Sequence, residues 1–222
     1  MMTPINGKVV LITGAGRGQG RQLALSLAAQ GALLALNDIS PINVDEVARE
    51  ISANGHGQAR VYIHDVAKKV AVQALINQVL DDFGHLDILI NHANVQPSAG
   101  LLEMDEWDLH RVFEVNTIGA FLVMQSAARV MREQGNGLIV NLLGSFGPSS
   151  PPAYSSSRLA VAGLTRQIAS ELAAHGIRVY GLAHGLDFPD AFAPAFPGAS
   201  QAVEALCASQ DIPSGSILRL SA

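Results

Sequence analysis

The fold is decided by one stretch near the start of the chain, KVVLITGAGRGQG at residues 8–20. Its first part, Lys8–Ile12, is a short apolar run typical of a buried strand, and the rest is rich in glycine. Gln19–Gln30 follows with leucines and alanines at helical spacing, and Gly31 ends that helix. A strand, a glycine-rich turn and a helix in this order predict a site where the backbone approaches a phosphate group at a helix N-terminus.

Apolar runs and helical patterns keep alternating along the rest of the chain. The predicted strands read as continuous apolar runs, which is typical of a parallel sheet covered by helices on both faces. We therefore expect one α/β domain over residues 1–222, a Rossmann-type doubly wound parallel sheet of about seven strands. The predicted strands are Lys8–Ile12, Ala32–Asn37, Arg60–His64, Leu86–Asn91, Leu138–Leu143, Ile177–Leu182 and Ser216–Leu220. The predicted helices are Gln19–Gln30, Val44–Ala53, Lys68–Phe83, Asp105–Glu133, Ala153–His175 and Ser200–Ser209.

One stretch near the C-terminal end departs from this alternation. Phe188–Pro197 contains three prolines, so we expect a loop there rather than a domain boundary. In open α/β sheets ligands bind at the carboxyl ends of the strands, and this stretch follows such an end. We interpret residues 188–199 as a short loop on the substrate side, followed over residues 200–222 by an abbreviated helix and strand.

The amino-acid composition indicates whether the protein associates with partners. The 222 residues are 49% apolar and only 15% charged, against about 25% charged in a typical protein. A monomer with so few charges would expose apolar patches, which usually mark contacts with partners. We therefore expect a homo-oligomer, a dimer or a tetramer.

Charge, hydropathy and cysteine content exclude several classes of protein. The net charge is −5 without a basic block, so nucleic-acid binding is not expected. No apolar run approaches the roughly 18 residues of a membrane span, and Val9–Ile12 is too short for a signal peptide. The single cysteine, Cys207, suits a reducing cytoplasm. Seven histidines without ligand spacing predict no metal site.

A glycine-rich turn alone is weak support for a dinucleotide site, and Asp38 strengthens it. This residue follows Gly20 by 18 residues and ends the second predicted strand, where a carboxylate can accept hydrogen bonds from both adenosine ribose hydroxyls. The same charge repels a 2′-phosphate, so NAD is favoured over NADP. Arg17 acts in the opposite direction, because a basic side chain there could face a phosphate. We expect the carboxylate to dominate.

With these residues the chain resembles the short-chain dehydrogenases/reductases over nearly its whole length. Gly14, Gly18 and Gly20 match the family pattern T-G-x-x-x-G-x-G. The pair at 65–66, Asp-Val, is similar to the family pair that contacts adenine. Residues 91–94 read Asn-His-Ala-Asn where the family has Asn-Asn-Ala-Gly, so His92 and Asn94 are departures.

The catalytic motifs of the family are found in order as well. Asn116, within Val-Asn-Thr-Ile-Gly at 115–119, resembles the family's structural and proton-relay asparagine. Tyr154 and Arg158 stand where the family has Tyr-x-x-x-Lys. The resemblance implies hydride transfer between nicotinamide and a secondary alcohol or ketone, with Tyr154 as the acid/base, Arg158 as its positive partner and Asn116 in support.

The residues that this resemblance implies for the site form two sets. The catalytic set is Tyr154, Arg158, Asn116 and Ser145. The cofactor-binding set is Gly14, Arg17, Gly18, Gln19, Gly20, Asp38, Asp65, Val66, Asn91, Ala93, Tyr154, Arg158 and Gly185. NAD is the expected cofactor, NADP the less favoured one, and a small-molecule alcohol or carbonyl compound the expected substrate.

Several departures bear on catalysis. Arg158 keeps a positive charge, but a guanidinium cannot give up a proton as a lysine ammonium can. Ungapped counting puts Gly144 at the position of the family serine and Ser145 one residue later, with Ser149 and Ser150 as further alternatives. The family's Pro-Gly after the sixth strand reads His-Gly at 184–185, and Asp187 falls where an apolar residue is usual.

Two functions therefore remain open from the sequence. The first is an NAD-dependent oxidoreductase of the short-chain type. The second is a dinucleotide-binding protein with weak or no catalysis, such as a sensor or an assembly subunit. His92 and His184 could serve as substitute acids, since histidine titrates near neutrality, but space-filling beside a cofactor is the simpler interpretation.

Overall fold

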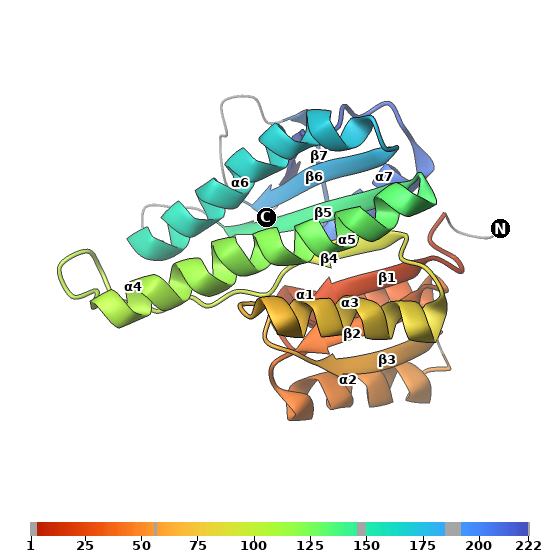
Figure 1. Ribbon diagram of the computed structural model, residues 1–222, viewed down its shortest axis with the longest axis horizontal. Helices are drawn as coiled ribbons and strands as arrows, with labels where there is room; N and C mark the ends of the chain where they lie inside the picture. Colours follow the sequence, from red (N-terminus) through yellow and green to blue (C-terminus); the bar gives the residue numbers. More distant parts are fainter. Residues whose placement is uncertain (1–3, 56, 146–149, 185–191, 222) are drawn as a thin grey trace.

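The computed structural model describes residues 4–55, 57–145, 150–184 and 192–221. Its centre is one parallel sheet of eight strands in the order β3-β2-β1-β4-β5-β6-β8-β7 (Figure 1). The strands are β1 (Val9–Thr13), β2 (Leu33–Asp38), β3 (Gln58–Ile63), β4 (Ile88–Asn91), β5 (Gly137–Ser145), β6 (Ile177–His184), β7 (Phe192–Phe196) and β8 (Ile217–Leu220). Every pairing is parallel. The predicted doubly wound α/β fold is confirmed.

Helices cover both faces of the sheet. In Figure 1 one layer lies in front and contains α3 (Lys69–Phe83), α4 (Glu106–Phe113), α5 (Ala120–Gln134) and α6 (Pro152–Ala173). The layer behind contains α1 (Gly18–Ala29), α2 (Pro41–Ala53) and α7 (Ala199–Ala208). Strand β1 is buried on both faces: Val9 and Leu11 belong to one hydrophobic core, and Val10 and Ile12 belong to the other. This burial explains why the strands read as unbroken apolar runs.

The C-terminal region corrects one prediction. Residues 192–196, expected within a loop, form strand β7, which pairs with β8 through Phe192↔Leu218 and Phe196↔Leu220. The sheet therefore has eight strands rather than about seven. Strand β7 lies at the edge of the sheet, where proline is tolerated within a strand, so Pro194 is compatible with it. The rest of the expected loop up to residue 191 lies outside the described residues.

The predicted helix Asp105–Glu133 is continuous but irregular. Between α4 and α5 the chain forms a π-helix, η1 (Glu114–Gly119), with Asn116 at its centre. Such wide turns inside an α-helix occur frequently at functional sites. Among the described helices, none has the length and the apolar character needed to cross a membrane.

The sheet reverses its strand order between β1 and β4, and ligands of such sheets bind at this point. The ends of the two strands are joined by Thr13. Its hydroxyl donates to Asn91 Oδ1 at 3.3 Å and accepts from the backbone N–H groups of His92 and Ala93 at 3.0 and 3.1 Å. These bonds hold the chain after β4 against the glycine-rich turn after β1.

Candidate active site

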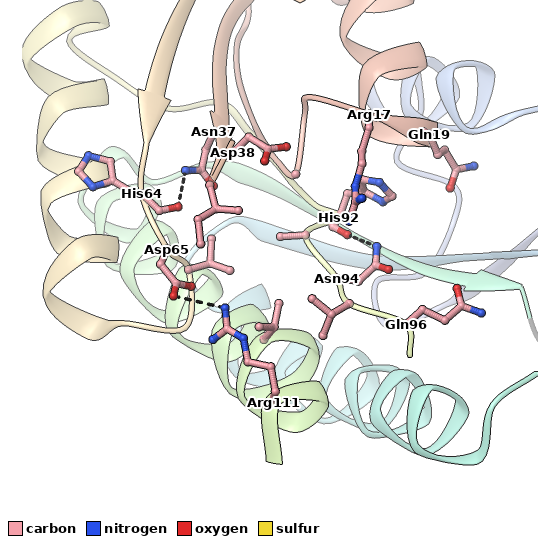
Figure 2. Close-up of a pocket in the computed structure, with 17 residues that line it drawn as sticks. Arg17, Gln19, Asn37, Asp38, His64, Asp65, His92, Asn94, Gln96 and Arg111 are labelled. Carbon is pink, nitrogen blue, oxygen red and sulfur yellow. Dashed lines mark hydrogen bonds and ion pairs between the residues drawn. The ribbon is translucent and has the colours of Figure 1, made fainter. Parts of the chain in front are cut away.

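A cavity of about 400 Å³ opens at the switch point between β1 and β4. Figure 2 shows its lining: side chains of the glycine-rich turn on one side, the ends of β2 and β3 on another, and the chain after β4 between them. Eight of the residues predicted to bind the cofactor line this cavity, namely Gly14, Arg17, Gly18, Gln19, Asp38, Asp65, Val66 and Ala93. The structure therefore brings together residues that lie up to 79 positions apart in the sequence.

Other predicted residues lie elsewhere. Gly20, Asn91, Asn116, Ser145, Tyr154 and Arg158 do not line this cavity. Gly185, like Asp187 and Ser149, falls outside the described residues, so the structure gives no position for it.

The glycine-rich turn presents bare backbone to the cavity. Arg17 is the N-cap of α1, and no side chain caps the N–H groups of the first turn. A side chain at Gly18 would point into open space, and the residue has a φ of 55°. At Gly14, by contrast, a Cβ would come within 2.8 Å of the Ala93 backbone. The turn is therefore packed tightly beneath the cavity while the uncapped N–H groups remain available for an anion.

Asp38 is held in place by two backbone groups. Its Oδ2 accepts from the N–H of Gly16 at 2.9 Å, and its Oδ1 accepts from the N–H of Ser40 at 3.0 Å. These bonds fix the carboxylate at the cavity wall, and each of its oxygens keeps a second lone pair for a ligand.

The opposite end of the cavity contains a residue that the sequence did not reveal. Arg111 of α4 lies with its Nη2 3.5 Å from Asp65 Oδ2, and its Nη1 donates to Glu114 at 3.1 Å. Asp65 Oδ1 accepts from the N–H of Ala67 at 2.9 Å. No local pattern marks Arg111, because it comes from a helix 46 residues away from its partner. The other lining residues outside the predicted set are Asn37, Ile39, His64, His92, Asn94, Val95, Gln96 and Val115.

Asn91 belongs to a buried polar chain beneath the cavity. Its Nδ2 donates to the Ala120 carbonyl at 2.9 Å and to Asn141 Oδ1 at 3.3 Å. Asn141 in turn donates to Thr165 Oγ1 at 2.9 Å. The chain crosses from β4 through β5 to α6, so the amide of Asn91 holds together the elements that carry the site.

Asn116 has a similar positioning role at the π-helix. Its Nδ2 donates to the Val95 carbonyl at 2.9 Å and to Ser157 Oγ at 3.0 Å, and its Oδ1 accepts from the N–H of Val95 at 2.8 Å. Both amide hydrogens are therefore used within the protein. The side chain ties the loop after β4 to the first turns of α6, which carry Tyr154 and Arg158.

Tyr154 and Arg158 form a closed corner between α6 and β5. Their exposed fractions are only 5% and 2%, respectively. The Arg158 guanidinium donates to the carbonyls of Leu142 and Asn116, at 2.5 and 3.4 Å. Burial lowers the pKa of Arg158, and its charge interaction and hydrogen bond with Tyr154 act in the opposite direction. The guanidinium thus has carbonyl and phenol oxygens as partners, and its buried Nε has none among the described residues.

The tyrosine hydroxyl rests directly against Gly144. A Cβ built on Gly144 would overlap the Tyr154 hydroxyl and would lie 3.2 Å from Cζ. The pairing of β5 with β6 is irregular between Leu142 and Gly144, and Gly144 has a φ of 80°. This bulge turns bare backbone toward the tyrosine. Ser145, the predicted substitute serine, is exposed at the end of β5, opposite His184 in register.

The two histidines that depart from the family pattern both contact the glycine-rich turn. His184 Nε2 and Gln19 Nε2 are 2.9 Å apart and share a hydrogen bond. His92 lines the cavity, and a Cβ on Gly20 would lie 2.6 Å from its Cδ2. Burial, with the positive charges of Arg158 and Arg17, lowers the pKa of His92 to about 4, although Asp38 opposes this shift. His92 is therefore uncharged at neutral pH.

The described residues contain no group of three or more side chains suited to hold a metal ion. The chemistry that the cavity favours is the binding of an anionic nucleotide. One end of the cavity offers the uncapped N–H groups of α1 and the fixed carboxylate of Asp38. The buried Tyr154 and Arg158 lie between α6 and β5.

Comparisons with known proteins agree with this arrangement. The family described as short chain dehydrogenase matches residues 8–190. An uncharacterized oxidoreductase of Thermotoga maritima is 39% identical over 182 residues, which cover 81% of this chain and 71% of that protein. A (2S)-[(R)-hydroxy(phenyl)methyl]succinyl-CoA dehydrogenase subunit of Thauera aromatica is 38% identical over 184 residues, covering 82% of this chain and 74% of that protein.

One solved structure resembles this chain over nearly the whole fold. The NAD+-bound xylitol dehydrogenase superposes with a TM-score of 0.82 at 29% identity, covering 97% of this chain and 98% of the other. The family profile alone spans most of the chain, and the sheet order and the glycine-rich turn conform to it. The chain belongs to the short-chain dehydrogenase family.

Proposed function

We propose that the protein is an NAD-dependent dehydrogenase that transfers hydride between nicotinamide and a secondary alcohol or ketone. The observation that carries this proposal is the Asp38 carboxylate, fixed at the wall of the cavity beside the uncapped N-terminus of α1. Adenosine ribose offers hydroxyl donors to such a carboxylate, and a 2′-phosphate would be repelled by it. Membership of an oxidoreductase family supports the reaction class, and the preference for NAD is our own inference.

The residues of the cavity fit a dinucleotide. Gly14 and Gly18 let the backbone come close, and the first-turn N–H groups of α1 would receive the pyrophosphate. Asp38 would hold the adenosine ribose, and Asp65 with Val66 would lie at the adenine. When bound, NAD supplies the carbon that accepts or releases the hydride.

The proton transfer is assigned to Tyr154. In the oxidation of an alcohol its oxygen takes the hydroxyl proton, and in the reverse direction it returns the proton to the carbonyl oxygen. A phenol ordinarily ionises near pH 10, so a nearby positive charge favours the ionised form. Arg158 provides that charge from a site with an exposed fraction of 2%. Asn116 holds the helix that bears both residues, and Ser145 is the candidate hydrogen-bond donor to the substrate oxygen.

The relatives support a substrate with an oxidisable carbon–oxygen bond. Among them are the dehydrogenase of Thauera aromatica, which acts on a hydroxylated CoA thioester by its name, and a 3-oxoacyl-[acyl-carrier-protein] reductase of Thermotoga maritima. We propose a small-molecule alcohol or carbonyl compound for this chain. The cytoplasmic location indicated by the single cysteine stays a prediction.

Exposed apolar side chains support the proposed homo-oligomer. Trp107, Ile118 and Phe121 have exposed fractions of 73%, 51% and 41%, and Leu159 of α6 has 48%. They belong to α4, η1, α5 and α6, which follow one another across the front layer in Figure 1. A second copy packed on these helices would remove this apolar surface from water.

Titration of the wild-type protein with NADH and NADPH, followed by turnover measurements with a panel of secondary alcohols and ketones, tests the proposal. We expect tighter binding of NADH and turnover of part of the panel. Tight NADH binding without any turnover would instead favour a dinucleotide-binding protein without catalysis. Light scattering on the same preparation is expected to give the mass of a dimer or a tetramer.

A further inference from the structure

The imidazole of His92 is a polar group of the cavity that the proposed mechanism does not use. The backbone of this residue is already engaged, since its N–H donates to Thr13 Oγ1 and its carbonyl accepts from Asn94 Nδ2 at 2.8 Å. Within the described part of the chain, neither ring nitrogen has a hydrogen-bond partner. The hydrogen bonds of this residue therefore involve its backbone, and the donor and the acceptor of its ring have no partner among the described residues.

The position of the ring indicates what it would meet. His92 lines the cavity, and Figure 2 shows it on the same side as Arg17 and Gln19. A Cβ at Gly20 would approach its Cδ2 to 2.6 Å, so the ring packs against the first turn of α1. A dinucleotide that places its pyrophosphate at this helix end would bring acceptor oxygens beside the ring.

The surroundings also determine the protonation state of the ring. The charged groups that act on it come from three elements: Arg17 from the glycine-rich turn, Asp38 from β2 and Arg158 from α6. Burial and the two arginines outweigh the carboxylate, and the pKa falls to about 4. An uncharged imidazole has one N–H donor and one acceptor nitrogen.

We propose that His92 is a further cofactor-binding residue, whose uncharged imidazole donates a hydrogen bond to the pyrophosphate of the bound dinucleotide. This inference rests on the proposed function, because it needs a dinucleotide in the cavity. A hydrogen bond to a charged phosphate oxygen is stronger than one between neutral groups, and removal of the donor would leave that oxygen without this partner.

The affinity of the intact protein for NADH, followed by nicotinamide fluorescence, tests the proposal on matched variants. His92→Phe keeps a ring against Gly20 and removes the donor, so we expect the dissociation constant to rise by about tenfold or more. His92→Asn keeps an N–H donor on a shorter side chain and should lie between wild type and His92→Phe. His175→Phe removes an exposed histidine and should bind NADH as wild type does. Melting temperatures of all variants report whether the fold is retained.

Two further measurements sharpen the result. Binding of ADP-ribose, which has the pyrophosphate, should weaken in His92→Phe by the same factor as binding of NADH, whereas binding of adenosine should not change. The wild-type affinity should vary less than about threefold between pH 6.5 and 8.5, because an uncharged donor does not titrate there. A steep gain in affinity toward low pH that disappears in His92→Phe would instead show a charged imidazolium and would overturn the proposal.

The failure of this inference differs from the failure of the proposed function. If His92→Phe binds NADH as tightly as wild type, or if adenosine binding falls equally, the role of His92 is wrong and the dehydrogenase proposal stands. If the wild-type protein binds neither NADH nor NADPH, the dehydrogenase proposal fails, and the role of His92 fails with it.

Discussion

The cofactor cavity and the tyrosine corner of this protein contrast in how they are built. The cavity consists of turns and strand ends: eight of its predicted residues meet there, and its main polar contacts use backbone N–H groups. The corner of Tyr154, Arg158 and Gly144 depends on side-chain packing across β5, with an irregular strand and a buried guanidinium. In the first region the Asp38 side chain is fixed by backbone groups, whereas the second leaves no space for a side chain at Gly144.

This contrast bears on positions 158 and 144, where we expect this chain to depart from the lysine and serine of the family pattern. Arg158 reaches two backbone carbonyls with one guanidinium, and the hydroxyl of Tyr154 occupies the space of a side chain at position 144. Restoring a serine at Gly144 would displace the tyrosine rather than complete the family pattern, so glycine there is part of how this chain places its tyrosine.

The largest effect is expected at Tyr154, which separates the two regions most clearly. Tyr154→Phe removes the hydroxyl to which we assign the proton transfer, and general acid–base catalysis contributes about 10² to 10⁴ in rate. We expect turnover to fall by roughly a thousandfold. NADH affinity should stay within about threefold of wild type, because Tyr154 does not line the cavity. Steady-state kinetics and NADH titration on the same preparation check both statements, and turnover that persists at the wild-type rate would show that another group moves the proton.

The contrast also explains which parts were predictable from sequence. Glycines, the acidic end of β2 and the continuous apolar strands are local signals, and the structure places the predicted strands and helices nearly as expected. Arg111 was missed because its contact with Asp65 joins residues far apart in the chain. Strand β7 was missed because proline usually excludes a strand, and only its place at the sheet edge permits it.

The arrangement of Tyr154, Arg158 and Gly144 could not be predicted from the sequence either. Counting residues puts Gly144 at the serine position, but a count cannot reveal that β5 is irregular there or that a phenol fills the space. Likewise, Asn116 and Arg158 match two separate motifs of the family pattern. Only the fold shows the Asn116 carbonyl as a partner of the Arg158 guanidinium.

An effect of intermediate size is expected from Gly144, in a double-mutant cycle with Tyr154. Gly144→Ala meets the tyrosine hydroxyl in wild type but meets the ring carbons Cζ at 3.2 Å and Cε1 at 3.7 Å in Tyr154→Phe. The cost of the positive φ, about 1 kcal/mol, is the same in both backgrounds and cancels. We expect Gly144→Ala to destabilise the wild type by about 2 kcal/mol more than it destabilises Tyr154→Phe. Urea unfolding of the four proteins measures this coupling energy.

Gly84 provides the matched control for that cycle. Its φ of 79° is nearly that of Gly144, and a Cβ there would meet nothing within 4 Å. Gly84→Ala should therefore cost the same in the wild-type and Tyr154→Phe backgrounds. A coupling energy near zero at Gly144 would mean that the hydroxyl does not occupy the position described here, and the buried tyrosine corner would have to be revised.

The smallest effect is expected in the cofactor region, at Asp38. Asp38→Ser removes the carboxylate that we propose repels a 2′-phosphate and accepts from the ribose hydroxyls, while a serine oxygen can still accept from a backbone N–H. We expect the ratio of NADH to NADPH affinity to fall by about tenfold, equivalent to about 1.4 kcal/mol. Asp45→Ser makes the same change of charge at an exposed position of α2 and should leave the ratio unchanged. Fluorescence titration with both nucleotides decides the question, because an equal ratio in Asp38→Ser and wild type would show that backbone contacts alone select the cofactor.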